Sequence, residues 1–220
     1  MMLIVSMFDQ AWRPFFLNHA KDKNAKNLFA KVLTFFTAFA SWVLLGLVFL
    51  MPTIIQSNIF GKFHLIAPQY WGGLKVIAPV ILGYFFYGLY INFMVGPVIT
   101  KRTRVLMWIT LLGAATSITV NLLLVPHVGI VGAGWAVAIS YLTMACALFA
   151  FTQKVYPLPY EYTKLLLIGL LAGAMAYGVH SAADVLSTWQ LLEFKVGLLC
   201  AYPLMMWLII RGRKTAKGDL

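Results

Sequence analysis

Six stretches of nearly continuous apolar residues divide this chain, and short segments with turn residues or charges separate them. A helix rises about 1.5 Å per residue and the hydrocarbon core of a bilayer is about 30 Å thick, so about twenty apolar residues cross it as a helix. The pattern therefore predicts an all-α fold, a polytopic transmembrane helix bundle. Its full spans are expected at residues 32–51, 76–100, 105–125, 131–151, 165–179 and 191–210.

The composition leaves no room for a sizeable soluble domain. Apolar residues make up 62% of the 220 residues and charged residues only 10%, whereas a soluble domain carries about 25% charge. Residues 1–17 are apolar but lack a basic leader and a small-residue cleavage site, which argues against a secretory signal. We expect them to form a partial span, and residues 1–220 to form a single transmembrane domain.

The net charge of +11 does not indicate nucleic-acid binding, because the basic residues are segregated by loop. Alternate loops hold thirteen of them against three in the others, which by the positive-inside rule places the rich loops and the C-terminus in the cytoplasm. The rich set is Lys21, Lys23, Lys26, Lys31, Lys101, Arg102, Arg104, Lys154, Lys164, Arg211, Arg213, Lys214 and Lys217; the poor set is Lys62, Lys75 and Lys195.

No pattern of catalytic or metal-binding residues stands out. Cys146 and Cys200 lie in predicted spans without ligand spacing, and the histidines, His64 among them, lack acidic partners at ligand spacing. The sequence has no nucleophile–base pair and no glycine-rich phosphate loop. We therefore expect no enzyme, no metal and no cofactor.

Asp9, Gln10 and Arg13 are costly residues if residues 1–17 enter the membrane. The spacing of Asp9 and Arg13 allows an ion pair on one helical face, and Pro14 frees the carbonyl of Gln10 and favours a kink. Two interpretations stay open. The segment faces an aqueous cavity, where Arg13 meets a phosphate, or the pair merely stabilises a bend.

The span at residues 76–100 carries Tyr84, Tyr87, Tyr90 and Asn92 between prolines and glycines. The three tyrosines share roughly one helical face. Such a face suits sugars, which offer C–H faces and hydroxyl groups, so these four residues are candidate substrate contacts. Helix–helix packing through interhelical hydrogen bonds is the alternative.

Close packing is predicted at two further places. A short link containing Pro126, followed by Gly129, Gly132 and Gly134, predicts an antiparallel hairpin between neighbouring spans. Gly169 and Gly173 have the spacing of a helix-packing pair.

The hairpin sequence SITVNLLLVPHVGIVGAGWAVAISY, residues 117–141, resembles the signature hairpin of polysaccharide flippases: a helix ending N-L-x-L-(I/V)-P, then G-I-x-G-A-x-x-A. QAWRPFFLNHA, residues 10–20, is similar to a Pro-Phe stretch that ends an even-numbered helix on the cytoplasmic side in the same family. Those proteins belong to the multidrug, oligosaccharide-lipid and polysaccharide exporter superfamily.

The resemblance implies the C-terminal lobe of a two-lobed transporter, the eighth to fourteenth helices, with the N-terminal lobe expected upstream. It implies a flippase of lipid-linked oligosaccharides, of the undecaprenyl-pyrophosphate type, for O-antigen-like polysaccharide in the bacterial inner membrane. Arg13 is then the well-placed cation for the pyrophosphate. The implied partners are the cargo, membrane lipids, the other lobe and glycan-polymerisation proteins.

Two other functions stay open. A cation-coupled multidrug exporter of the same superfamily would use a buried carboxylate, for which Asp9 is the candidate at membrane depth. A non-transporting membrane subunit of a glycan-synthesis complex would need no second lobe.

Overall fold

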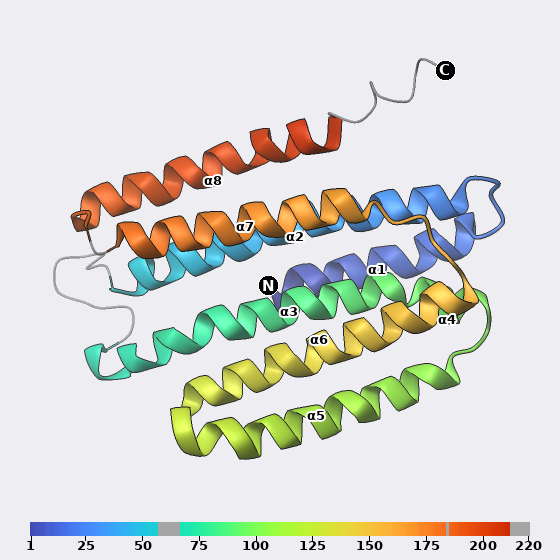
Figure 1. Ribbon diagram of the computed structural model, residues 1–220, viewed down its shortest axis with the longest axis horizontal. Coiled ribbons are helices and arrows are strands. Elements are labelled where there is room, and N and C mark those ends of the chain that lie inside the picture. The colour runs from blue at the N-terminus through green and yellow to red at the C-terminus, as the bar shows by residue number, and fades with distance from the viewer. Residues whose placement is uncertain (57–66, 184, 212–220) are drawn as a thin grey trace. The chain divides into compact units, whose positions relative to one another are not determined.

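The computed structural model describes residues 1–56, 67–183 and 185–211, and within these it is all-α, without a strand. Figure 1 shows the helices in chain order. They are α1 (Met2–His19), α2 (Ala25–Gln56), the 3-10 helix η1 (Pro68–Val76), α3 (Ile77–Phe93), α4 (Val95–Ile99), α5 (Arg104–Val128), α6 (Ile130–Val155), α7 (Tyr162–Ala182) and α8 (Thr188–Arg211).

Six helical segments of the described chain are long and apolar enough to cross a membrane. They coincide with the six predicted spans and extend beyond most of them, because charged or polar residues such as Lys26 and Lys154 prolong the helices past the apolar stretches. The predicted polytopic bundle is confirmed. Helix α1 supplies the partial span. Lys62, His64, Arg213, Lys214 and Lys217 lie outside the described residues.

The chain separates into two compact units, Met1–Leu33 with Ile66–Tyr160, and Thr34–Leu65 with Glu161–Leu220. The boundary falls inside α2, so the first turns of that helix belong to the first unit and the remainder to the second. Each unit is described by itself below.

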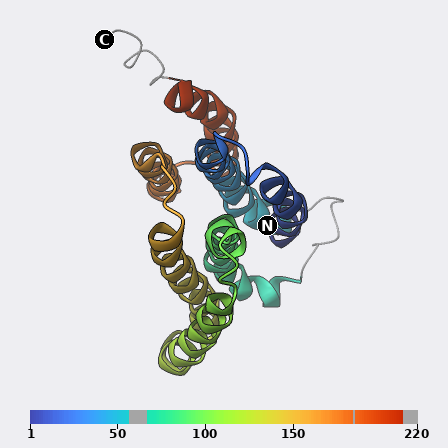
Figure 2. The same ribbon diagram turned by 90° about the vertical axis from the view of Figure 1, so that its right-hand side faces the viewer.

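In the first unit, α6 packs between α3 and α5, as Figure 2 shows from the end. Small residues on α6 make this close approach possible. A Cβ atom on Gly83 of α3 would lie 2.9 Å from Val137 of α6, and one on Gly134 would lie 3.0 Å from Pro79 of α3. Gly132, Gly134, Ala136 and Ala138 are all buried.

Helices α5 and α6 form the predicted hairpin, but its link differs from the expected one. Pro126 lies inside α5, which continues to Val128, and Gly129 alone connects the helices. Gly129 has a φ of 62°, a conformation that side chains with a Cβ rarely adopt. Pro126 has no N–H to donate to the carbonyl of Leu122, so one helical hydrogen bond is lost there, and any bend that it causes affects only the last turn of α5.

The Gly169–Gly173 pair does not pack as predicted within the described chain. A Cβ atom at either position would meet no heavy atom within 4 Å, and both glycines are exposed on α7.

A break separates α3 from α4 at Met94. Pro97 has no N–H to donate to the carbonyl of Phe93, four residues earlier. The hydroxyl of Thr152 on α6 donates to that carbonyl instead, at 2.7 Å. Thr152 is fully buried, and it packs so closely on Gly96 that a Cβ there would clash.

We expect Thr152→Val to destabilise the first unit by about 1–3 kcal/mol, since it leaves the buried Phe93 carbonyl without a donor. Thr143→Val is the matched control on the same helix. The Thr143 hydroxyl only donates back to Ile139 of its own helix, so this change should stay within about 0.5 kcal/mol. Thermal unfolding in detergent measures both, and equal losses would contradict this role for Thr152.

In the second unit, residues of α2, α7 and α8 share an apolar core that includes Leu45, Ile168 and Tyr202. The hydroxyl of Tyr202 is hydrogen-bonded to Ser41 at 2.5 Å, and the Trp42 indole donates to the Leu199 carbonyl. These contacts satisfy polar groups that lipid could not; the Ser41–Tyr202 pair is buried, whereas the Trp42 side chain is exposed.

Candidate functional site

The ion pair predicted on α1 is present. Arg13 donates from Nε to Oδ1 of Asp9 at 2.7 Å, and α1 continues through Pro14 to His19. The Arg13 side chain is 54% exposed and that of Asp9 22%. Within the described chain, the two terminal nitrogens of Arg13 have no hydrogen-bond partner, so they are free to meet another group.

A neighbouring face of α1 is fixed by aromatic packing. The buried Trp12 stacks on Phe8 and Phe15 with ring centroids 5.7 Å apart, and it meets Phe16 and Phe29 edge-on. Aromatic contacts of this kind hold a helix face firmly. Because Trp12 and Arg13 are neighbours in sequence, burying Trp12 sets the side from which Arg13 projects.

Arg13 lies at a cavity of about 470 Å³ formed by α1, α3, α5 and α6 within the first unit. The lining combines aromatic rings, hydroxyl groups and methionines. It consists of Arg13, Tyr87, Tyr90, Met94, Thr110, Gly113, Ala114, Ser117, Val137, Ser140, Tyr141 and Met144.

Four tyrosines from two helices form a continuous cluster along this cavity. Tyr87 and Tyr90 of α3 stack with centroids 6.0 Å apart. Tyr141 of α6 lies 4.9 Å from Tyr87 and 6.1 Å from Tyr84. The tyrosine face predicted on α3 therefore exists, and α6 extends it.

Most of the other hydroxyl groups at the cavity are already paired. Ser140 donates to the Gly113 carbonyl at 2.7 Å, Thr110 donates to Leu106 of its own helix, and Tyr90 shares a side-chain hydrogen bond with Thr110. Within the described residues, the hydroxyls of Tyr87 and Tyr141 have no such partner. These two phenols keep free hydrogen-bonding capacity, together with Arg13 and the Ser117 hydroxyl, which only accepts from Asn121 Nδ2 at 3.5 Å.

The seven predicted site residues are only partly brought together. Arg13, Tyr87 and Tyr90 line the cavity, Asp9 is paired with Arg13, and Tyr84 joins through Tyr141. Gln10 and Asn92 do not line it. Gln10 is exposed, whereas Asn92 is buried and donates to the Gly88 carbonyl at 2.9 Å, its own Oδ1 without a partner in the described chain.

Sequence reasoning missed the contributions of α5 and α6: Thr110, Ser117, Ser140 and Tyr141. A usable signal was present, because Ser140 and Tyr141 are adjacent polar residues after ten apolar or glycine residues of α6, and Ser117 follows Thr110 by two helical turns. However, only the packing of α6 against α3 and α5 in the folded chain shows which of these polar residues lie at the same cavity.

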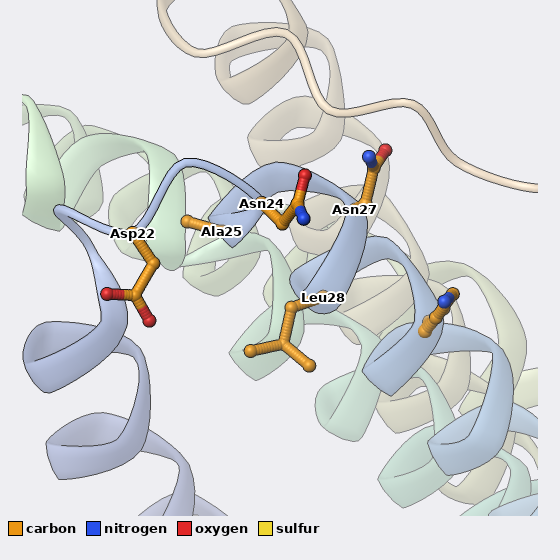
Figure 3. Close-up of a pocket in the computed structure, with 6 residues that line it drawn as sticks. Asp22, Asn24, Ala25, Asn27 and Leu28 are labelled. Atoms are coloured by element: carbon orange, nitrogen blue, oxygen red, sulfur yellow. The ribbon is translucent and has the colours of Figure 1, made fainter.

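A second depression, of about 280 Å³, lies at the turn between α1 and α2. Figure 3 shows Asp22 and Leu28 pointing to one side of the turn and Asn27 to the other. Because the polar groups do not converge, we assign this depression no binding role. Within the described residues, no group of three histidine, cysteine or acidic residues could hold a metal ion.

No protein-family model matches the chain, and no curated protein matches it significantly by sequence. A solved structure of the lipid II flippase MurJ, in an inward closed conformation, is similar with a TM-score of 0.70. The chain shares its fold with part of that flippase. The similarity covers 94% of this chain at 18% identity.

The similarity covers only 44% of the MurJ chain, so this chain spans less than half the length of the protein that it resembles. At this identity the likeness concerns the fold alone. The expected resemblance to a flippase is confirmed at that level.

Proposed function

We propose that the chain forms one lobe of a two-lobed, alternating-access flippase that moves a lipid-linked oligosaccharide across the membrane. The observation that carries this proposal is the cavity at Arg13, where one cationic side chain meets phenol hydroxyls inside a bundle of apolar helices. Charged residues at membrane depth are costly and are usually functional. The flippase fold agrees with the proposal.

The chemistry of the cavity suits an anionic, glycosylated lipid. The terminal nitrogens of Arg13 can donate two parallel hydrogen bonds to a phosphate oxygen pair. Asp9 holds Nε and so orients the guanidinium. The tyrosines add aromatic faces and hydroxyls for a sugar.

The cargo, location and partners follow as parts of the same proposal. We propose a cargo of the undecaprenyl-pyrophosphate type, destined for O-antigen-like surface polysaccharide, and a bacterial inner membrane with the C-terminus in the cytoplasm. The second lobe and glycan-polymerisation proteins are the proposed partners. We propose no catalytic activity.

A cation-coupled drug exporter is less well supported. Its coupling site needs a carboxylate that can bind and release a cation, whereas the Asp9 carboxylate is already engaged by Arg13 at 2.7 Å.

The test removes the charge of Arg13 in the protein as the cell makes it. The amount of folded protein and the rate of transport are measured separately. Arg13→Gln leaves Asp9 unpaired and should lower the amount of folded protein, as should Asp9→Asn. The double change should restore folding but not transport, because the phosphate contact is still missing. Transport of the lipid-linked saccharide should fall at least about tenfold, the equivalent of one charge-assisted hydrogen bond.

Two controls sharpen this test. Arg13→Lys keeps the charge but not the planar fork, so transport should be intermediate. Arg102→Gln removes a cation from the exposed turn before α5 and should change nothing. Normal transport by a folded double variant would refute the role of Arg13.

A further inference from the structure

The tyrosine cluster bears on which part of a cargo this cavity recognises. We propose that Tyr87 and Tyr141 bind the sugar next to the phosphate, and that the remainder of the glycan is not read by this cavity. The proposal rests on the proposed function and adds Tyr141 as a residue that determines specificity.

The geometry of the two rings is the first support. Tyr87 and Tyr141 come from different helices, with centroids 4.9 Å apart and planes inclined at 40°. Both rings line the cavity, and both are partly exposed. Each ring therefore keeps accessible surface at the cavity.

The hydroxyl groups are the second support. Within the described chain, Ser140 and Thr110 donate to backbone carbonyls, while the phenols of Tyr87 and Tyr141 have no partner. An unpaired phenol beside an aromatic face can bind both the hydroxyls and the C–H groups of a pyranose ring. Where a bound sugar shields such a hydroxyl from water, the hydroxyl gives specificity, because a ligand without the matching group leaves it unpaired.

The size of the cavity is the third support, because it indicates how much of the cargo can contact the lining. Its volume of about 470 Å³ lies in the lower part of the range of roughly 300–1,000 Å³ for small-molecule sites. Such a space accommodates a phosphate and one sugar, and the further sugars of a long glycan would extend beyond its lining through its open side. Among the described residues Arg13 is the one cationic side chain in the lining, so the phosphate belongs beside it and the sugar beside the tyrosines.

The test compares three probes bound to the purified protein as the cell makes it: a bare polyprenyl pyrophosphate, the same lipid with one hexose, and the same lipid with a complete oligosaccharide. We expect the first sugar to strengthen binding about fivefold to tenfold, the size of a good aromatic contact. The further sugars should add less than about twofold. Tyr141→Leu should remove the gain from the first sugar, so that this variant binds the one-hexose lipid no more tightly than it binds the bare lipid.

Three variants distinguish this role from a structural one. Tyr141→Phe keeps the ring and should retain part of the gain, whereas Arg13→Gln should weaken all three probes alike. Tyr177→Leu, at an exposed tyrosine of α7, should change nothing. A steady gain with glycan length, or equal weakening of all probes by Tyr141→Leu, would overturn this inference while leaving the proposed function intact. Failure of the unaltered protein to bind any probe would refute both.

Discussion

Gly132→Leu should prevent the α5–α6 hairpin from closing and cost at least about 3 kcal/mol of stability. A Cβ atom on Gly132 would lie 2.7 Å from the carbonyl carbon of Leu124 and 2.9 Å from the backbone nitrogen of Val125, both on α5. Backbone atoms cannot turn aside as a flexible side chain can, so the two helices would have to separate. The expected result is a large loss of folded protein, measured by thermal unfolding of the 220-residue chain in detergent.

Gly173→Leu is the matched control for this prediction. The same change is made in the middle of an apolar helix, but a Cβ at Gly173 meets no atom within 4 Å. Its stability should be unchanged or slightly higher, since glycine is a poor helix former. If the two variants lost similar stability, the hairpin would not depend on close approach at Gly132.

The 220 residues alone should insert into the membrane but fail to restore surface polysaccharide to a strain that lacks its flippase. Alternating access needs two bundles facing one central site, and the proposed function assigns this chain one of them. Joining or co-expressing a second lobe should restore export fully. The measurement is surface polysaccharide in the complemented strain, with the insertion of the chain checked separately.

Either alternative outcome of this experiment is informative. Complementation by the chain alone would contradict the one-lobe proposal and indicate that two copies build the transporter. Failure even with the native second lobe would favour the non-transporting subunit of a glycan-synthesis complex.

The spans could be predicted from sequence because one physical requirement, about twenty apolar residues per crossing, determines them almost alone. The Asp9–Arg13 pair could be predicted for a similar reason, since helical spacing by itself brings the two side chains together. In both cases the relevant contacts are local along the chain.

Features that depend on contacts between distant residues could not be predicted. Tyr141 belongs to the tyrosine cluster only because α6 packs against α3. The small residues of α6 permit this packing, but the sequence does not indicate which helix they face. The break at Met94 is similar. Pro97 in the sequence indicates that one backbone hydrogen bond is missing. The hydrogen bond from Thr152, more than fifty residues later, that replaces it is visible only in the folded chain.

The single-residue link at Gly129 also constrains how the protein enters a membrane. Helices of 25 and 26 residues flank it, and a link of one residue keeps the end of α5 beside the start of α6. We therefore expect the two helices to insert together as a hairpin, with the turn leading. The segment from Pro126 to Val131 contains no lysine, arginine, aspartate or glutamate, so the leading end carries little that resists transfer through hydrocarbon.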